Sequence, residues 1–292
     1  MTLKELFAVY RSKKLRGASP NTIRLYIHTI RAFTKTLTHE PTIDDLDDDV
    51  VENHLWAIVE RGGSPASANK DRSQIIALWN FAFDRRIVER RPCVQTMKEP
   101  ERVPLGWLPE ELRALLDAAD NCPKNVGNVP GPVFWGALVR TILDTGERIG
   151  AVRSLPRNAI QGRYLLVAAN TRKGKTRDRL FPLNEDTIEA NKRLLDSHRE
   201  ELLYHWPYSP TYLYDHYNAI LAAANLPTDR QSKFHRIRRT VASAVARAGG
   251  DPTAALDHAS PRTTKKYLDP RIVGGVEVSS IVVNYLGVDS IG

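Results

Sequence analysis

The sequence has very little cysteine. Cys93 and Cys122 are the two cysteines among 292 residues, and they form no CxxC pair and no Cys/His cluster. A disulfide framework is therefore excluded, and a structural zinc is not expected, because such a site needs several closely spaced thiolates and imidazoles. Low cysteine usage fits a reducing cytosol. We expect no metal and no other cofactor, since no carboxylate cluster suited to magnesium stands near the motifs of the second half.

Long apolar runs are also missing. No stretch approaches the roughly 18 consecutive apolar residues of a membrane-spanning helix, so no membrane association is expected. The segment 1–20 mixes charged and apolar residues and does not have the pattern of a signal peptide. These features predict a cytoplasmic protein.

Positive charge is in excess. The chain carries 42 Lys and Arg against 34 Asp and Glu, a net charge of +8, and its pI is about 9.5. This balance favours a polyanionic partner. Residues 171–182 hold five cationic side chains against one acidic one, and residues 229–247 hold six against one. Two such clusters favour phosphate binding over a merely solvated face.

The first part of the chain has the pattern of a helical bundle. Apolar residues recur at helical intervals in four stretches, which begin near Leu3, Ser19-Pro20, Val50 and Ser64-Pro65. We therefore expect a small all-α domain over residues 1–92. The following segment, 93–106, is rich in proline and charge and is predicted to be a linker.

The second part mixes helices with a small sheet. Helices are expected over 109–120 and 133–144, and again from Glu185 onward. Between them, residues 164–167 and 179–181 have strand character and flank a tight basic turn. The predicted fold is mainly α with a small antiparallel β-sheet, and it consists of a helical bundle followed by a mixed α/β domain over 107–270. Residues 271–292 form a C-terminal tail.

Four short segments of this second part could carry chemistry. Thr145-Gly146-Glu147-Arg148 presents an arginine just after a helix. His235 and Arg238, at i and i+3, share one helix face, where a guanidinium can hold phosphate oxygens in two parallel hydrogen bonds. His258 precedes a short helix with a Ser260-Pro261 start, and Tyr267 follows nine residues later.

Taken together, these segments resemble the tyrosine recombinase (phage integrase) family. The match consists of Arg148 in T-G-x-R, His235 and Arg238 in H-x-x-R, then His258 and Tyr267, in the family's order. Lys173 in the basic turn matches the family's β-hairpin lysine. The resemblance covers nearly the whole chain. Residues 1–95 are similar to the family's core-binding (SAM-like) domain, and residues from about 105 onward to its catalytic domain.

This resemblance implies a site-specific DNA recombinase or integrase, an enzyme of mobile elements, that acts through a 3′-phosphotyrosyl intermediate. Tyr267 would attack a phosphodiester and His235 would accept its proton. Arg148 and Arg238, with a donor from His258, would hold the non-bridging oxygens, and Lys173 would protonate the leaving 5′-oxygen. Neither metal nor ATP is required. Lys175 remains a rival to Lys173, because the register of the turn is ambiguous.

The sequence lacks an acidic residue at a position where many members of the family have one. Many members carry an acid three positions after the first arginine, where this chain has Ala151. Glu147 stands just before Arg148 and is a substitute source of that charge.

Double-stranded DNA is the expected partner. The expected contacts to it are basic residues of the bundle, of the turn and of the helix carrying His235: Arg24, Lys70, Arg72, Arg172, Lys175, Arg177, Arg236 and Arg239. In the family, a C-terminal segment often docks into the next protomer of a four-subunit ring. The apolar tail 271–292 packs either on its own catalytic domain or on a neighbouring protomer. We expect a monomer in free solution, because no long apolar stripe is left unaccounted for elsewhere, and a homotetramer on paired sites, and accessory DNA-bending proteins fit this scheme.

Two other functions fit parts of the pattern. A type IB topoisomerase-like enzyme would use the same side chains to relax DNA, and a non-catalytic DNA-binding regulator would keep the fold without the reaction. The intact set of catalytic side chains argues against the regulator.

Overall fold

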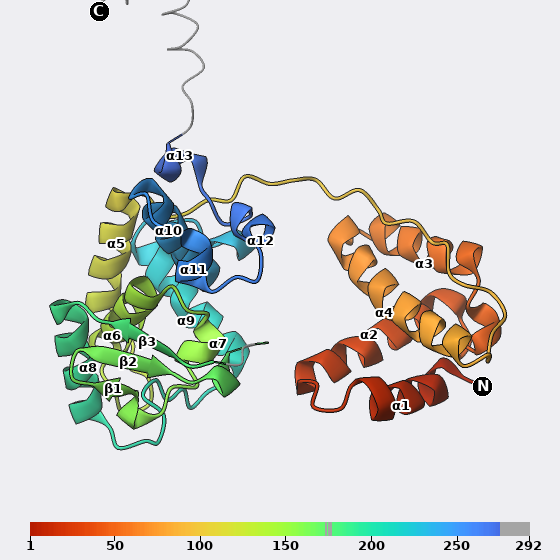
Figure 1. Ribbon diagram of the computed structural model, residues 1–292. Coiled ribbons are helices and arrows are strands. Elements are labelled where there is room, and N and C mark those ends of the chain that lie inside the picture. Colours follow the sequence, from red (N-terminus) through yellow and green to blue (C-terminus); the bar gives the residue numbers. More distant parts are fainter. Residues whose placement is uncertain (173, 175–176, 275–292) are drawn as a thin grey trace, which may run out of the picture. The chain divides into compact units, whose positions relative to one another are not determined.

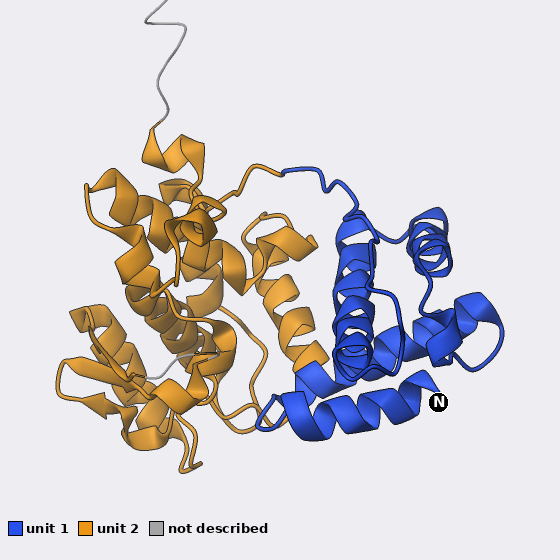
Figure 2. Cartoon of the chain, turned by 45° about the vertical axis from the view of Figure 1, so that its right-hand side comes forward, with its two compact units in different colours: residues 1–101 blue, residues 102–292 orange. Residues whose placement is uncertain are grey.

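The computed structural model describes residues 1–172, 174 and 177–274 (Figure 1). The chain divides into two compact units, Met1–Glu101 and Arg102–Gly292 (Figure 2). The division falls inside the segment 93–106 that the sequence predicts as a linker. None of the helices that the structure describes is long and apolar enough to cross a membrane.

The first unit is the predicted four-helix bundle. Its helices are α1 (Leu3–Lys14), α2 (Pro20–Leu37), α3 (Asp48–Glu60) and α4 (Pro65–Asp84), with a 3₁₀ turn η1 (Ile43–Asp45) between α2 and α3. The starts of α2 and α4 follow the sequence signals, because Ser19 and Ser64 accept N-cap hydrogen bonds and a proline occupies the first turn. The core holds Leu6, Phe33, Leu55, Ile75 and Trp79, among other apolar side chains.

Part of the predicted linker packs on this bundle. Val94 is buried in its core. Arg72 donates to the Val94 carbonyl at 2.6 and 3.0 Å, and Asn69 bonds the backbone N–H and C=O of Met97 at 2.9 and 2.8 Å. At the other end, Trp107 is fully buried in the second unit. The segment that belongs to neither core is therefore shorter than the predicted linker 93–106.

The second unit is helical with one small sheet. It contains α5 (Pro109–Asp120), α6 (Gly131–Thr145), α7 (Ile149–Val152), α8 (Glu185–Ser197), α9 (Pro210–Ala223), α10 (Phe234–Arg247), α11 (Pro252–Leu256), α12 (Pro261–Lys265) and α13 (Pro270–Val273). Helix α6 packs against α5, α8 and α10 and is buried along most of its length. Trp135 of α6 stacks on Phe234 and Tyr217, which fixes α6, α9 and α10 around one aromatic core.

The sheet has three antiparallel strands in the order β1 (Ile160–Gln161), β2 (Tyr164–Val167) and β3 (Arg179–Pro182). Leu165 pairs with Phe181 and Val167 pairs with Arg179, so the basic turn joins β2 to β3 as predicted. Strand β1 was not predicted, because a strand of two residues is too short to show an alternation of apolar and polar side chains. The mainly α fold with a small antiparallel sheet is confirmed.

Candidate active site

The first arginine stands in a tight turn. Helix α6 ends at Gly146, whose φ of 61° is the left-handed conformation that glycine adopts without strain. A Cβ there would also lie 2.9 Å from a methyl group of Leu256. Glu147 is then buried, and Arg148 occupies the position just before the short helix α7. The T-G-x-R motif thus bends the chain so that Arg148 follows directly on a buried carboxylate.

Helix α10 supplies the second arginine. Arg238 is almost completely buried and donates to the Gly146 carbonyl, to the Leu256 carbonyl at 2.7 Å, and to Nε2 of His258 at 3.2 Å. These bonds fix the guanidinium beside the T-G-x-R turn. His235, one turn earlier on the same helix, lies at the surface.

The tyrosine and the second histidine come from the segments after α10. The Tyr267 hydroxyl is 2.9 Å from His235 Nε2, and its ring centroid is 4.7 Å from that of His258. Because Arg238 donates to His258 Nε2, the proton of that imidazole is on Nδ1, 3.0 Å from the Thr264 hydroxyl. His258 could therefore donate a hydrogen bond to a phosphate from Nε2 only after that nitrogen gains a proton.

Neighbouring charges set the protonation of the site. The side chain of His235 reaches solvent, but the protein packed around its ring still desolvates it. This desolvation, and then the charges of Arg238, Arg239 and Arg148, lower the pKa of His235 to about 4, so its imidazole is neutral at pH 7. Burial and the charge of Arg148 lower the pKa of Arg238 to about 10, which leaves it cationic. The charge of Arg148 acts on the pKa of both His235 and Arg238, so its side chain lies near these two residues. The structure thus gathers Arg148, His235, Arg238, His258 and Tyr267, whereas Lys173 and Lys175 lie outside the described residues.

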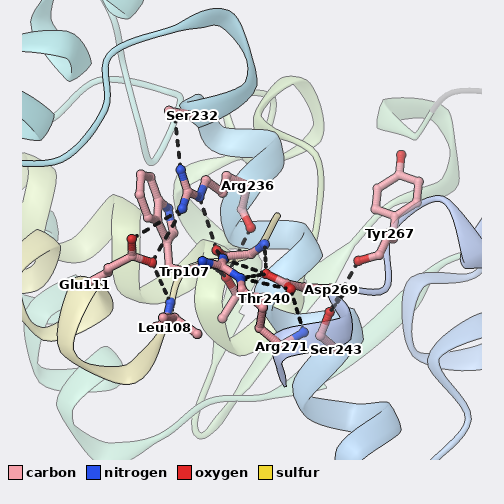
Figure 3. Close-up of polar contacts among 11 residues, drawn as sticks. Trp107, Leu108, Glu111, Ser232, Arg236, Thr240, Ser243, Tyr267, Asp269 and Arg271 are labelled. Carbon is pink, nitrogen blue, oxygen red and sulfur yellow. Dashed lines mark hydrogen bonds and ion pairs between the residues drawn. The ribbon is translucent and has the colours of Figure 1, made fainter. Parts of the chain in front are cut away.

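A buried polar network holds the backbone from Tyr267 to Asp269 (Figure 3). The Ser243 hydroxyl donates to the Tyr267 carbonyl at 3.3 Å and accepts from the Asp269 N–H at 2.8 Å. The fully buried Asp269 carboxylate accepts from the Gly106 N–H at 2.8 Å and from the Arg271 side chain at 2.8 Å. The ring of Tyr267 points away from this network, toward His235. Ser243 was not predicted from the sequence. Asp269 could have been noticed, because Asp269-Pro270 has the pattern of a helix N-cap followed by the first helical residue.

Two arginines predicted to contact DNA are buried instead. Arg236 stacks 3.6 Å from the ring of Trp107 and donates to Ser232 and Gly106 (Figure 3). Arg172 is 3% exposed and pairs with Glu147 and Asp257. Both guanidinium groups are therefore occupied inside the second unit, and a run of charge in the sequence does not reveal which of its members point inward.

The other predicted DNA contacts differ in exposure. Arg24 is exposed, and the Arg177 side chain is 80% exposed. Lys70 is partly buried and 2.5 Å from the Asp71 carboxylate, Arg72 is occupied with the Val94 carbonyl, and Arg239 is half-buried. Arg24 and Arg177 are therefore the more accessible cations of this set.

A tyrosine hydroxyl beside a neutral imidazole and two arginines suits nucleophilic attack on a phosphate. Comparison with known proteins identifies the family. Residues 108–272, more than half of the chain, match the profile of the Phage integrase family. Residues 12–86 match that of the Phage integrase, N-terminal SAM-like domain. The chain belongs to this family, the tyrosine recombinases.

A curated relative is the tyrosine recombinase XerD of Chlamydia trachomatis serovar D, 25% identical over 206 residues. That match covers 68% of this chain and 64% of the relative, just under two thirds of its length.

Two solved structures have the same fold. An integrase of transposon Tn1549, in complex with a circular-intermediate DNA, superposes with a TM-score of 0.73 at 16% identity, over 99% of this chain and all of the other. A lambda integrase tetramer bound to a Holliday junction gives 0.72 at 18% identity, over 93% of this chain and 78% of the other.

Proposed function

We propose that this protein is a site-specific DNA recombinase that cleaves and rejoins DNA through a phosphotyrosyl intermediate. The observation that carries the proposal is the 2.9 Å contact between the Tyr267 hydroxyl and the neutral His235 imidazole. This contact lies beside the two arginines, so nucleophile, proton acceptor and anion-binding groups occupy one site.

The attack step follows from these positions. The Tyr267 oxygen attacks phosphorus while its proton passes to His235 Nε2. A pKa of about 4 makes His235 a weak base in the free protein. A bound phosphodiester adds negative charge beside it and raises that pKa, so DNA binding itself prepares the proton acceptor.

The transition state carries extra negative charge on the non-bridging oxygens. Arg148 and Arg238 would hold these oxygens, and Arg238 is already oriented by two backbone carbonyls and His258. As the P–O5′ bond breaks, the 5′-oxygen takes a proton, which we assign to Lys173. A 5′-hydroxyl of a partner strand then reverses the step, so each ester broken is replaced by another and no ATP is needed.

We assign the binding of duplex DNA to both units, with residues 1–92 as the core-binding domain and residues 107–270 as the catalytic domain. The Tn1549 and lambda relatives were solved on DNA, the latter as a tetramer. We propose that this chain is likewise a tetramer on paired sites and a monomer when free. Its activity then belongs at the nucleoid, in the cytoplasm, with accessory DNA-bending proteins as further partners.

Recombination between two target sites, in excess EDTA and without ATP, tests this proposal. The site is first selected from a random pool of duplexes. We expect joined products from two-site DNA. Relaxation of supercoiled DNA without joined products would indicate a type IB topoisomerase-like enzyme. Specific binding without any covalent adduct would indicate a regulator, and a strict need for magnesium in cleavage would contradict the metal-free mechanism.

A further inference from the structure

Helix α10 holds Tyr267 at two points. The Tyr267 hydroxyl is 2.9 Å from Nε2 of His235. The Tyr267 carbonyl accepts a hydrogen bond from the Ser243 hydroxyl at 3.3 Å. His235 and Ser243 are at i and i+8 of α10, about two helical turns apart. The tyrosine therefore lies along this helix, with its hydroxyl fixed at one end and its backbone at the other.

The Ser243 hydroxyl makes two different bonds to the same segment (Figure 3). It donates to the Tyr267 carbonyl and accepts from the Asp269 N–H at 2.8 Å. One hydroxyl can do both, because it has one donor and two acceptor lone pairs. Ser243 is completely buried, so its loss would leave a buried backbone donor and a buried backbone acceptor without a partner, a condition that folded proteins avoid. The segment would then have to shift to find other partners.

The Asp269 carboxylate extends this anchor to the start of the second unit. It is completely buried and accepts from the Gly106 N–H and from the Arg271 side chain, each at 2.8 Å. Burial raises the pKa of this carboxyl, but Arg271 and the Gly106 N–H outweigh burial and lower it, so Asp269 is ionised at pH 7. A side chain would not fit at Gly106, because a Cβ there would lie 2.8 Å from a methyl group of Ile272 and 3.1 Å from the backbone of α10. The residues after Tyr267 are thus fixed both to α10 and to the segment before α5.

We propose that Ser243 is a positioning residue for the nucleophile: it fixes the backbone of Tyr267 so that the hydroxyl meets His235, and Asp269 completes the anchor. This inference rests on the proposed recombinase function. In this proposal neither Ser243 nor Asp269 contacts the phosphate, and both act through Tyr267.

Nucleophilic attack is sensitive to a displacement of this kind. The Tyr267 oxygen must approach phosphorus in line with the breaking P–O5′ bond while its proton passes to His235. A displacement of about 1 Å at a reacting atom can cost about 10²-fold in rate. Affinity for DNA, by contrast, is spread over many phosphate contacts. Loss of the Ser243 hydroxyl should therefore slow cleavage and leave binding intact.

The first experiment compares Ser243→Ala with Thr141→Val on a nicked duplex that traps the adduct. Thr141 is the matched control, because it is also completely buried and its hydroxyl accepts from Tyr204 and Asn191 at 2.6 and 2.9 Å. Single-turnover rates at saturating enzyme report the reaction of the folded, bound protein, and gel shifts give the affinity. We expect Ser243→Ala to lower the cleavage rate by about 10–10²-fold at unchanged DNA affinity, and Thr141→Val to change neither.

The second experiment needs no DNA. The NMR signal of the His235 ring nitrogens, assigned by its absence in His235→Gln, reports the contact with the Tyr267 hydroxyl, and Tyr267→Phe gives the signal without that contact. We expect Ser243→Ala to move the His235 signal toward its position in Tyr267→Phe, and Thr141→Val to leave it in place.

An unchanged cleavage rate or an unchanged His235 signal in Ser243→Ala would overturn the proposal, and so would equal slowing by Thr141→Val, which would indicate a merely structural role. If Ser243→Ala does not fold, Ser243→Cys is used, since a thiol is a weak donor and a weak acceptor; the same changes should appear at smaller size, and their absence again contradicts the proposal. Absence of any adduct with the unaltered protein would instead contradict the recombinase function, whereas the His235 signal would still test the position of Tyr267.

Discussion

At the scale of single residues, the two arginines have different surroundings but one expected task. Arg238 is buried and held by backbone carbonyls, whereas Arg148 is half-buried at the start of α7. In the proposed mechanism, both would hold the charge that develops on a reacting phosphate. Affinity for DNA is spread over many phosphate contacts, but transition-state charge is concentrated at these two groups.

Arg148→Ala and Arg238→Ala should therefore each lower the cleavage rate by about 10²–10³-fold, the usual cost of removing one transition-state donor. DNA affinity should fall much less. Gel-shift titration and single-turnover cleavage on the same duplex separate the two effects. Equal losses of affinity and rate would mean that the arginines only anchor DNA.

His235 provides a pH test that needs no DNA. Its pKa is about 4 in the folded protein, below the ordinary value of 6.5. Between these values the unfolded chain binds a proton that the folded chain does not, so His235 makes stability rise with pH across this window. When the pH is lowered from 7 to 5, the free energy of unfolding measured with urea should fall less in His235→Gln than in the unaltered protein. Equal losses would show that the His235 pKa is not depressed.

The residue scale also shows what the sequence could predict. Arg148, His235, Arg238, His258 and Tyr267 were predicted from motif order, and the structure brings them together. The inward direction of Arg172 and Arg236 could not be predicted, because their burial depends on carboxylates distant in the chain. Ser243 was missed for the same reason: nothing in its helix marks it as the partner of the segment around Tyr267.

At the scale of elements, helix boundaries followed local signals closely. Ser-Pro pairs mark the starts of α2, α4, α9 and α12, and each serine accepts an N-cap bond. The linker was less predictable, because its proline-rich composition does not show that Val94 enters the core of the first unit or that Trp107 enters that of the second. Tertiary contacts decided those limits.

Three helices of the first unit meet at a buried polar group. Asp71 of α4 accepts from Thr29 of α2 at 2.6 Å, and His54 of α3 lies 3.5 Å away. Burial raises the Asp71 pKa, but the contacts of the carboxylate with His54, Lys70 and Thr29 outweigh burial and hold the pKa at about 2. The ionised carboxylate therefore joins α2, α3 and α4.

Asp71→Asn should destabilise the bundle by about 1.5–3 kcal/mol, the range for a hydrogen bond to a charged group. Because the folded pKa is depressed from 3.8, this stabilisation is present above pH 3.8 and is lost as pH falls through about 2. Hydrogen exchange of α2, α3 and α4 measured at pH 7 should be faster in the variant. Unchanged protection of these helices would show that Asp71 does not stabilise them.

At the scale of the whole molecule, the C-terminal segment is the part for which we propose a role in assembly. The tail was predicted to begin at residue 271, but that limit cuts through α13, where Arg271 bonds Asp269 and Ile272 is buried. Residues 275–292 lie outside the described residues, and their sequence is rich in apolar side chains. We propose that they join protomers on DNA.

Truncation after Gly274 preserves α13 and tests this role. Binding to a single site should be unchanged, because the described part of the second unit is intact. The complex of two sites and the recombined product should be lost. Native gel electrophoresis with one-site and two-site duplexes gives both readings. Recombination at the full rate by the shortened chain would rule out a role of the tail in assembly.

The central claim is that Tyr267 becomes covalently joined to DNA. The most direct measurement incubates the protein with a nicked trapping duplex and separates the denatured products, followed by mass spectrometry of the DNA-linked peptide. The account predicts an adduct on the peptide containing Tyr267, and no adduct with Tyr267→Phe, although that variant binds the duplex with unchanged affinity. An adduct that persists in Tyr267→Phe, or maps to another residue, would contradict it.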